Sequence, residues 1–177
     1  LLTMKLQRLH IKGFRNIDDL DLDLSSQKGL SVLIGNNGSG KSNILEAIVA
    51  IFARLYSKAK RFKVDFEYDL EYLLDGHKVE LKDSGRSNFV DSVKIKNSLL
   101  KDYLPKNIIA SYSGETSRLE DGFFTPFRKA YVRNRLLSHS AVQRMWFINK
   151  DMWDISLLVL FMHDFDVFTD CPPAPEE

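Results

Sequence analysis

Four residues in the first quarter of the chain have the types and the spacing that bind phosphate groups. Gly35, Gly40, Lys41 and Ser42 fit the pattern G-x-x-x-x-G-K-[ST] at every position. Glycines adopt backbone angles that other residues avoid, so consecutive N–H groups in such a loop can converge on phosphate oxygens. In this pattern the lysine contacts the β- and γ-phosphates and the hydroxyl is a ligand of Mg²⁺. The motif predicts a nucleotide site.

The predicted site includes the whole loop and the residue that follows its serine. Its members are Gly35, Asn36, Asn37, Gly38, Ser39, Gly40, Lys41, Ser42 and Asn43, with Ser42 as the Mg²⁺ ligand. The competing interpretation is a glycine turn that binds nothing. A strand before the loop and a helix after it are the context that distinguishes the two.

Two elements must position this loop. The apolar run from Leu30 to Ile34 is rich in β-branched residues and predicts a buried strand. The helix that follows would direct the positive end of its dipole at the bound anion. Its apolar face is marked by Ile44, Ile48, Ile51, Phe52 and Leu55.

Composition limits the remaining possibilities. The chain has 177 residues, of which 44% are hydrophobic, enough for the core of one domain. A net charge of +1 is not that of a basic nucleic-acid coat, so any nucleic-acid contact must be local. The single cysteine, Cys171, excludes internal disulfides and suits a reducing cytoplasm. The longest apolar run, 157–162, is too short to cross a membrane, so we expect a cytoplasmic protein without a membrane partner.

Two strands are predicted before the loop, at residues 5–12 and 20–24. The second alternates leucine with aspartate, which is typical of a half-buried strand. Its carboxylates, Asp19, Asp21 and Asp23, could suggest a metal site, but alternating positions of this kind favour a solvated face.

An antiparallel meander is predicted for residues 65–96. Residues 65–72 alternate between aromatic or apolar and acidic side chains, and Asp75 with Gly76 is a hairpin signal. A return strand holds Val79 and Leu81; Gly85 and Asn88 predict a second turn before a third strand at 93–95.

The remainder of the chain is predicted to be mainly helical. Residues 107–112 favour a short, wholly buried strand, and Thr125 with Pro126 has the order of an N-cap followed by a first helical residue. This helix carries a possible basic patch, which is alternatively a solvated face. Its cations are Arg128, Lys129, Arg133 and Arg135. Gln143 is expected in a helical setting.

The opening I-K-G-F-R-N-I, two strands, and then G-N-N-G-S-G-K-S-N-I-L-E-A-I resembles the N-terminal half of an ABC-type ATPase head. The resemblance covers residues 5–56. The specific kin are the RecF, SMC and OLD group, including AAA-family ATPases encoded with restriction and antiviral systems. It implies an α/β P-loop NTPase fold: an ABC-ATPase-like N-terminal lobe with the antiparallel meander and a helical C-terminal part at 125–164. We expect one ATP-binding domain at 1–164 and a disordered tail at 165–177.

The resemblance also implies roles for residues outside the motif. Arg15 and Asn16 would lie beside the bound nucleotide, and Asn37 and Asn43 would flank the phosphate loop. The ligands would be ATP and Mg²⁺. ATP would clamp two heads together as a homodimer, and hydrolysis would release them to control action on DNA or on a partner nuclease.

Hydrolysis needs further groups, and no catalytic residue can be assigned. Residues 157–164 resemble a Walker B strand, but Phe165 follows Asp164 where a catalytic glutamate is needed. Residues 113–115 invite comparison with the signature motif, although a turn after a strand is the favoured interpretation. Either the chain is the N-terminal piece of a longer ATPase, or it is complete and binds nucleotide without turnover.

Alternative functions stay open at this point. They are a non-hydrolysing, nucleotide-dependent interaction module and, less favoured, a small-molecule kinase. A GTPase is discounted, because Met152 stands where the N-K-x-D guanine motif requires aspartate.

Overall fold

A computed structural model of the chain describes residues 4–26, 30–57, 62–111, 117–137, 143–148, 152–154 and 158, with the backbone alone for 134–137. By its internal contacts the chain divides into two compact units, Leu1–Asn107 and Ile108–Glu177. None of the helices in the described ranges is long and apolar enough to span a membrane.

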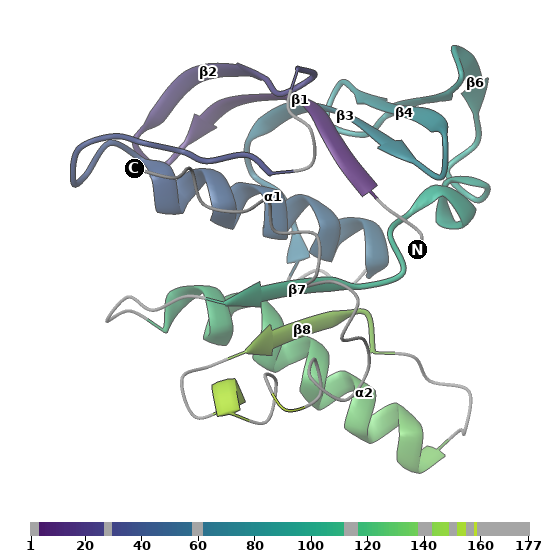
Figure 1. Ribbon diagram of the computed structural model, residues 1–177. Coiled ribbons are helices and arrows are strands. Elements are labelled where there is room, and N and C mark those ends of the chain that lie inside the picture. The colour runs from purple at the N-terminus through teal and green to yellow at the C-terminus, as the bar shows by residue number, and fades with distance from the viewer. Residues whose placement is uncertain are drawn as a thin grey trace, which may run out of the picture. The chain divides into compact units, whose positions relative to one another are not determined.

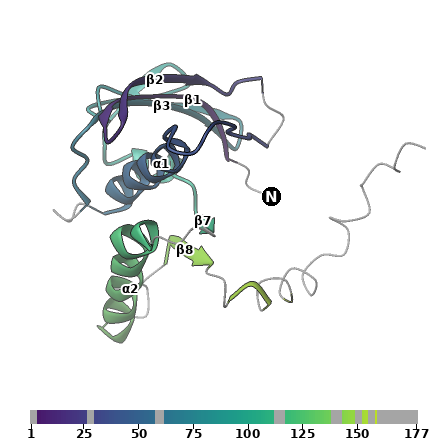
Figure 2. The same cartoon turned by 90° about the vertical axis from the view of Figure 1, so that its left-hand side faces the viewer.

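The first unit has two layers, an antiparallel sheet and one helix that lies against one face of it (Figures 1 and 2). Its strands are β1 (Met4–Phe14), β2 (Ile17–Asp23), β3 (Glu67–Leu74), β4 (His77–Lys82), β5 (Ser87–Val90) and β6 (Val93–Ile95). Their spatial order is β2-β1-β3-β4-β5-β6, and every neighbouring pair is antiparallel. Helix α1 (Lys41–Tyr56) follows the glycine-rich loop, and a 3₁₀ turn, η2 (Leu100–Tyr103), follows β6. The predicted α/β class is confirmed.

Helix α1 and the inner face of this sheet form the core. The ring of Phe52 on α1 lies 6.0 Å, centroid to centroid, from the ring of Tyr72 on β3. These two side chains are 1% and 0% exposed, so the contact is fully removed from water. Of the positions predicted as the apolar face of the helix, Ile44, Ile51 and Phe52 are buried, whereas Ile48 and Leu55 are half-buried.

Strand β1 carries one residue more than its neighbour β3. Leu6 pairs with Tyr72 and Arg8 pairs with Glu71, so Gln7 between them is a β-bulge. The bulge shifts the alternation of side chains by one position. Leu6 before the bulge and Leu9 after it therefore face the same inner side, although strict alternation would separate residues three apart.

The predicted meander is present, but it has four strands instead of three. Asn88, expected in a turn, lies in β5 and is 1% exposed. Asp75 and Gly76 form the predicted hairpin turn, with φ of 52° and 86°. The missed hairpin joins β5 to β6 through Asp91 and Ser92, whose φ angles are 48° and 67°. Two-residue turns with positive φ at both positions favour Asn-Gly or Asp-Gly. Ser92 stands where glycine is favoured, so the sequence lacks the full turn signal.

Residues 30–34 do not form the buried strand that was predicted before the loop. Leu30, Val32 and Ile34 are 77%, 68% and 93% exposed. An apolar run indicates that burial is favourable, but a strand also needs a neighbour for its N–H and C=O groups. No strand among the described residues pairs with this segment.

The second unit contains helix α2 (Thr125–Leu137) and a parallel pair of strands, β7 (Ile108–Ser111) and β8 (Met145–Ile148) (Figure 1). One π-helical turn, η3 (Glu120–Phe124), leads directly into α2. Thr125 is therefore not an N-cap: it is already helical, and its N–H donates to the carbonyl of Glu120. Pro126 lacks the N–H that an α-helix interior uses, and the π-helical turn before it changes the hydrogen-bond pattern at this point.

Strand β8 was not predicted and lies inside the segment expected to be helical. Gln143 precedes this strand and is not in a helix; its Nε2 donates to the carbonyl of Met145 at 3.1 Å. Strand β7 is also less enclosed than predicted, because Ile109 is 66% exposed. Among the described strands β7 pairs with β8 alone, which leaves its other edge open.

Some predicted features lie outside the described residues. They are the triplet at 113–115, Asp164, Cys171, the tail at 165–177 and the side chain of Arg135. Arg128, Lys129 and Arg133 are described and exposed on α2.

Burial of Tyr68 makes the stability of the first unit sensitive to alkali. Its side chain is 3% exposed, and desolvation raises its pKa to about 12. Above the ordinary tyrosine pKa of about 10, the unfolded chain loses this proton while the folded chain keeps it. The free energy of unfolding therefore falls as the pH rises from about 10 toward 12.

The wild type loses free energy of unfolding as the pH rises through this range. We expect Tyr68→Phe to make that loss smaller by roughly 2 to 3 kcal/mol. Urea midpoints measured between about pH 9 and pH 12 should decline less steeply for the variant than for the wild type. Tyr72, whose pKa burial also raises, retains part of the slope. Identical slopes for the two proteins would contradict the assignment to Tyr68.

Candidate phosphate-binding site

The glycine-rich loop makes a tight turn into α1. Gly38 and Gly40 have positive φ angles of 83° and 92°, and the Ser39 N–H donates to the carbonyl of Asn36 at 3.2 Å. Helix α1 then begins at Lys41, with no side-chain hydrogen bond from its N-cap and no acidic residue in its first turn. The first N–H groups of the helix and the positive end of its dipole are therefore open to an anion.

The ammonium of Lys41 lies inside this loop. It donates to the carbonyl of Gly35 and, at 2.7 Å, to that of Asn36. The Ser39 hydroxyl lies 3.4 Å from the same ammonium. Phosphate oxygens would replace neutral carbonyls with anionic acceptors, which form the stronger hydrogen bonds. The structure thus gathers Gly35, Asn36 and Ser39 around one cation. Like them, Asn37 and Ser42 are exposed.

Asn16 holds the loop from the side of the sheet. Its Nδ2 donates to the carbonyl of Gly38 at 2.8 Å, and its Oδ1 accepts a hydrogen bond from Asn43 Nδ2 at 2.6 Å. A Cβ atom at Gly40 would approach the Asn16 Oδ1 to 3.2 Å, so glycine permits this close packing. The turn between β1 and β2 therefore connects the sheet to the loop and to the first turn of α1.

Arg15 does not contact the loop. Its guanidinium forms an ion pair with Glu46 on α1, whose side chain is only 8% exposed. A buried carboxylate needs such a partner, because its charge is costly to remove from water. The pair joins residues far apart in the sequence, and no role was predicted for Glu46. A place for Arg15 beside a bound nucleotide stays a prediction.

The geometry fits the phosphate chain of a nucleotide with Mg²⁺. A Cβ atom at Gly35 would lie 2.8 Å from the Ser39 hydroxyl, so the inside of the loop leaves no space for a side chain there. Lys41 supplies positive charge at the centre. Mg²⁺ usually takes one or two protein ligands together with phosphate oxygens and water, which suits the exposed Ser42 hydroxyl in the first turn.

We expect Asn16→Ala to weaken ATP binding roughly 10- to 30-fold. The substitution removes two hydrogen bonds that fix the loop, each worth about 1 kcal/mol. Calorimetric titration of the full chain with ATP and Mg²⁺ measures the effect. Asp18→Ala, which changes an exposed residue nearby on β2, is the control and should bind as the wild type does. Equal affinity of Asn16→Ala and the control would show that the clamp is not needed.

This glycine loop at the start of a helix, which packs on an antiparallel sheet, defines an α/β protein of the P-loop NTPase class. Residues 4–145, most of the chain, match the family model described as the AAA ATPase domain. The chain belongs to this family.

The relatives of the chain include proteins named DNA replication and repair protein RecF. RecF of Crocosphaera subtropica is 41% identical over 75 residues, which are 42% of this chain and 17% of that protein. RecF of Salmonella arizonae is 54% identical over 48 residues, or 27% of this chain and 13% of that protein. The chain therefore spans less than a fifth of the length of either relative.

The solved structures that align with the chain include a RecF protein and an SMC ATPase. The recombination mediator protein RecF with ATP has a TM-score of 0.38 and 20% identity, covering 77% of this chain and 42% of that one. An SMC ATPase, from a study of ATP-driven dimerization and DNA-stimulated activation, has a TM-score of 0.35 and 18% identity. That alignment covers 75% of this chain and 96% of the SMC chain.

Proposed function

We propose that the chain is the nucleotide-binding part of an ATPase head and binds ATP with Mg²⁺ in the loop from Gly35 to Asn43. The observation that carries the proposal is the Lys41 ammonium, held inside a glycine loop where α1 begins. Membership of an ATPase domain family supports ATP as the nucleotide. The absence of acidic side chains from the first turn of α1 supports an anionic ligand.

Each residue of the loop has a distinct part in this proposal. Lys41 exchanges its carbonyl partners for the β- and γ-phosphate oxygens, and the N–H groups at the start of α1 bind the same phosphates. The Ser42 hydroxyl orients the metal ion, which when bound neutralises charge on the phosphates. Asn16 positions the loop, and Arg15, the residue before it in the same turn, exchanges its pair with Glu46 for a contact with the nucleotide.

The cycle that follows is proposed to act on DNA. ATP clamps two heads together, and hydrolysis releases them. The named relatives, which are DNA replication and repair proteins, support DNA as the target. The resemblance to defence-associated ATPases adds a partner nuclease as the other target of the same cycle, in the cytoplasm.

ATP binding and phosphate release by the full chain, with and without duplex DNA, test the proposal. Lys41→Ala supplies the background for both measurements. ATP binding with phosphate release above this background supports an ATPase. ATP binding with equal background rates identifies a non-hydrolysing interaction module, and transfer of phosphate to an acceptor identifies a kinase. Failure of the wild-type chain to bind ATP would overturn the assignment of the site.

A further inference from the structure

Helix α1 carries a single acid, Glu46, and the structure buries it. The residue is 6% exposed, and it is the only charged residue that is buried in the described part of the chain. It follows Ser42 by one helical turn, near the end of α1 that is directed at the phosphate loop. A negative charge in this place opposes the binding of an anion unless a cation compensates it.

The compensating cation is Arg15, in the two-residue turn that joins β1 to β2. Its Nη2 donates to Oε1 of Glu46. The two side chains differ in their access to solvent, because that of Arg15 is 36% exposed and that of Glu46 is 8% exposed. A ligand in solution can therefore reach the guanidinium, whereas the carboxylate is closed to it.

The backbone of Arg15 has an unfavourable conformation. Its φ is 55°, and two-residue hairpin turns with positive φ at the first position favour glycine there. The side chain at this position costs free energy, which its own contacts must offset. In the free protein these contacts are the pair with Glu46 and the ring of Phe14, whose centroid lies 5.4 Å from the guanidinium carbon.

The ion pair lies next to the contact that holds the phosphate loop. Asn16, the residue after Arg15, accepts a hydrogen bond from Asn43, and Glu46 follows Asn43 by three positions on the same side of α1. The two contacts are therefore about one helical turn apart, roughly 5 Å along the helix axis. Arg15 is thus tied to α1 one turn beyond the residues that fix the loop.

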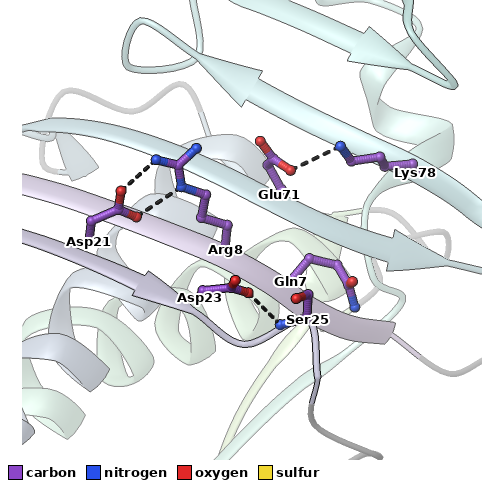
Figure 3. Close-up of a pocket in the computed structure, with 7 residues that line it drawn as sticks. All are labelled: Gln7, Arg8, Asp21, Asp23, Ser25, Glu71 and Lys78. Carbon is purple, nitrogen blue, oxygen red and sulfur yellow. Dashed lines mark hydrogen bonds and ion pairs between the residues drawn. The ribbon is translucent and has the colours of Figure 1, made fainter.

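The ion pairs on the outer face of the six-stranded sheet are of a different kind (Figure 3). There Arg8 Nε donates to Asp21 at 2.9 Å, and the two side chains are 53% and 47% exposed. Water solvates both charges when such a pair opens, so opening costs little. Opening the pair of Arg15 with Glu46 leaves a buried carboxylate without its partner, which costs much more.

We propose that Glu46 is a positioning residue that restrains ATP binding: it holds Arg15 in the free protein, and the nucleotide gains the guanidinium only by taking it from Glu46. This inference rests on the proposed contact of Arg15 with the nucleotide. Phosphate and carboxylate are both strong acceptors for a guanidinium, so they compete for it. The cost of leaving Glu46 without its partner is subtracted from the free energy of ATP binding.

Glu46→Gln tests the proposal, because it keeps the shape of the side chain and removes the charge that competes for Arg15. In calorimetric titrations of the full chain with ATP and Mg²⁺, we expect this variant to bind at least about fivefold more tightly than the wild type. The double variant Arg15→Ala, Glu46→Gln should bind at least about tenfold more weakly than Glu46→Gln, since no guanidinium remains to contact the phosphates. Neither variant leaves a buried charge without a partner, and urea midpoints check that both fold.

Asp21→Asn is the matched control, since it removes an acid that is paired with an arginine on the exposed face of the same sheet. Its ATP affinity should stay within about twofold of the wild type. Equal affinities of the double variant and Glu46→Gln would mean that loss of a negative charge alone favours the anion, which overturns the role of Arg15. Unchanged or weaker binding by Glu46→Gln would show that the acid does not restrain ATP. Failure of the wild type to bind ATP, by contrast, would overturn the phosphate site itself.

Nitrogen-15 NMR of the arginine side chains gives a second measurement, which a purely structural role of Glu46 would leave unchanged. The Nε signal of Arg15, assigned by its loss from the double variant, should move when ATP and Mg²⁺ are added to the wild type. The Nε signal of Arg8, which is bound to Asp21, should stay in place. A stationary Arg15 signal in the ATP-saturated protein would mean that the pair with Glu46 persists, and the proposal would then be wrong.

Discussion

Lys41→Ala is expected to lower the affinity of the full chain for ATP by about 100-fold or more. The ammonium is the only side-chain cation that the described structure places inside the loop. Hydrogen bonds to charged groups contribute about 1.5–3 kcal/mol each. In the proposed complex the Lys41 ammonium donates to two phosphate groups. A loss of about 3 kcal/mol corresponds to roughly 100-fold in the dissociation constant. Calorimetric titration with ATP and Mg²⁺ measures it.

Two companion variants separate the position of the charge from its presence. Lys12→Ala removes the same charge from an exposed place on β1 and should leave ATP affinity within about twofold of the wild type. Lys41→Arg keeps the charge but replaces a compact ammonium with a planar fork, so we expect an intermediate affinity. Wild-type affinity in Lys41→Ala would show that the nucleotide binds elsewhere.

Phe52→Ala is expected to lower the free energy of unfolding by about 3–5 kcal/mol. The side chain is 1% exposed and packs between the rings of Tyr56, at 6.3 Å, and Tyr72, at 6.0 Å. Truncation removes the ring from the contact between α1 and the sheet and leaves a cavity that its neighbours cannot fill. Urea unfolding, followed by circular dichroism, gives the change directly.

Leu45→Ala is the control for this substitution. Leu45 lies on the same helix but is 48% exposed, so its truncation should cost less than about 1 kcal/mol. Similar losses in the two variants would mean that α1 is not held to the sheet through Phe52. The difference also locates the core of the first unit on one side of the helix.

The sequence was sufficient for the features that depend on neighbouring residues. The loop and the start of α1 follow from glycines and a lysine within eight positions, and Asp75 with Gly76 specifies its hairpin locally. The alternation in β3 could also be recognised from the sequence, and every second residue from Tyr68 to Leu74 is indeed buried. Such patterns are read within one element and need no knowledge of its partners.

The features that were missed depend on partners distant in the sequence. The run at 30–34 has the composition of a buried strand, yet none of the described strands pairs with it. In the sequence Glu46 is one acid on a helix. Only the structure shows that the turn after β1 places Arg15 beside it. The bulge at Gln7 likewise appears only when β1 is paired with β3.

The position of β1 between β2 and β3 determines the order in which the first unit can assemble. The ladders from β3 to β6 are successive hairpins, and β1 with β2 is another, so each can close quickly. The ladder of β1 with β3 pairs Met4 with Leu74. The chain between these two strands, which includes the glycine loop and α1, must therefore close as one long loop. Closures of that length are slow. On a ribosome, α1 would therefore gain its contact with β3 only after that strand has left the exit tunnel.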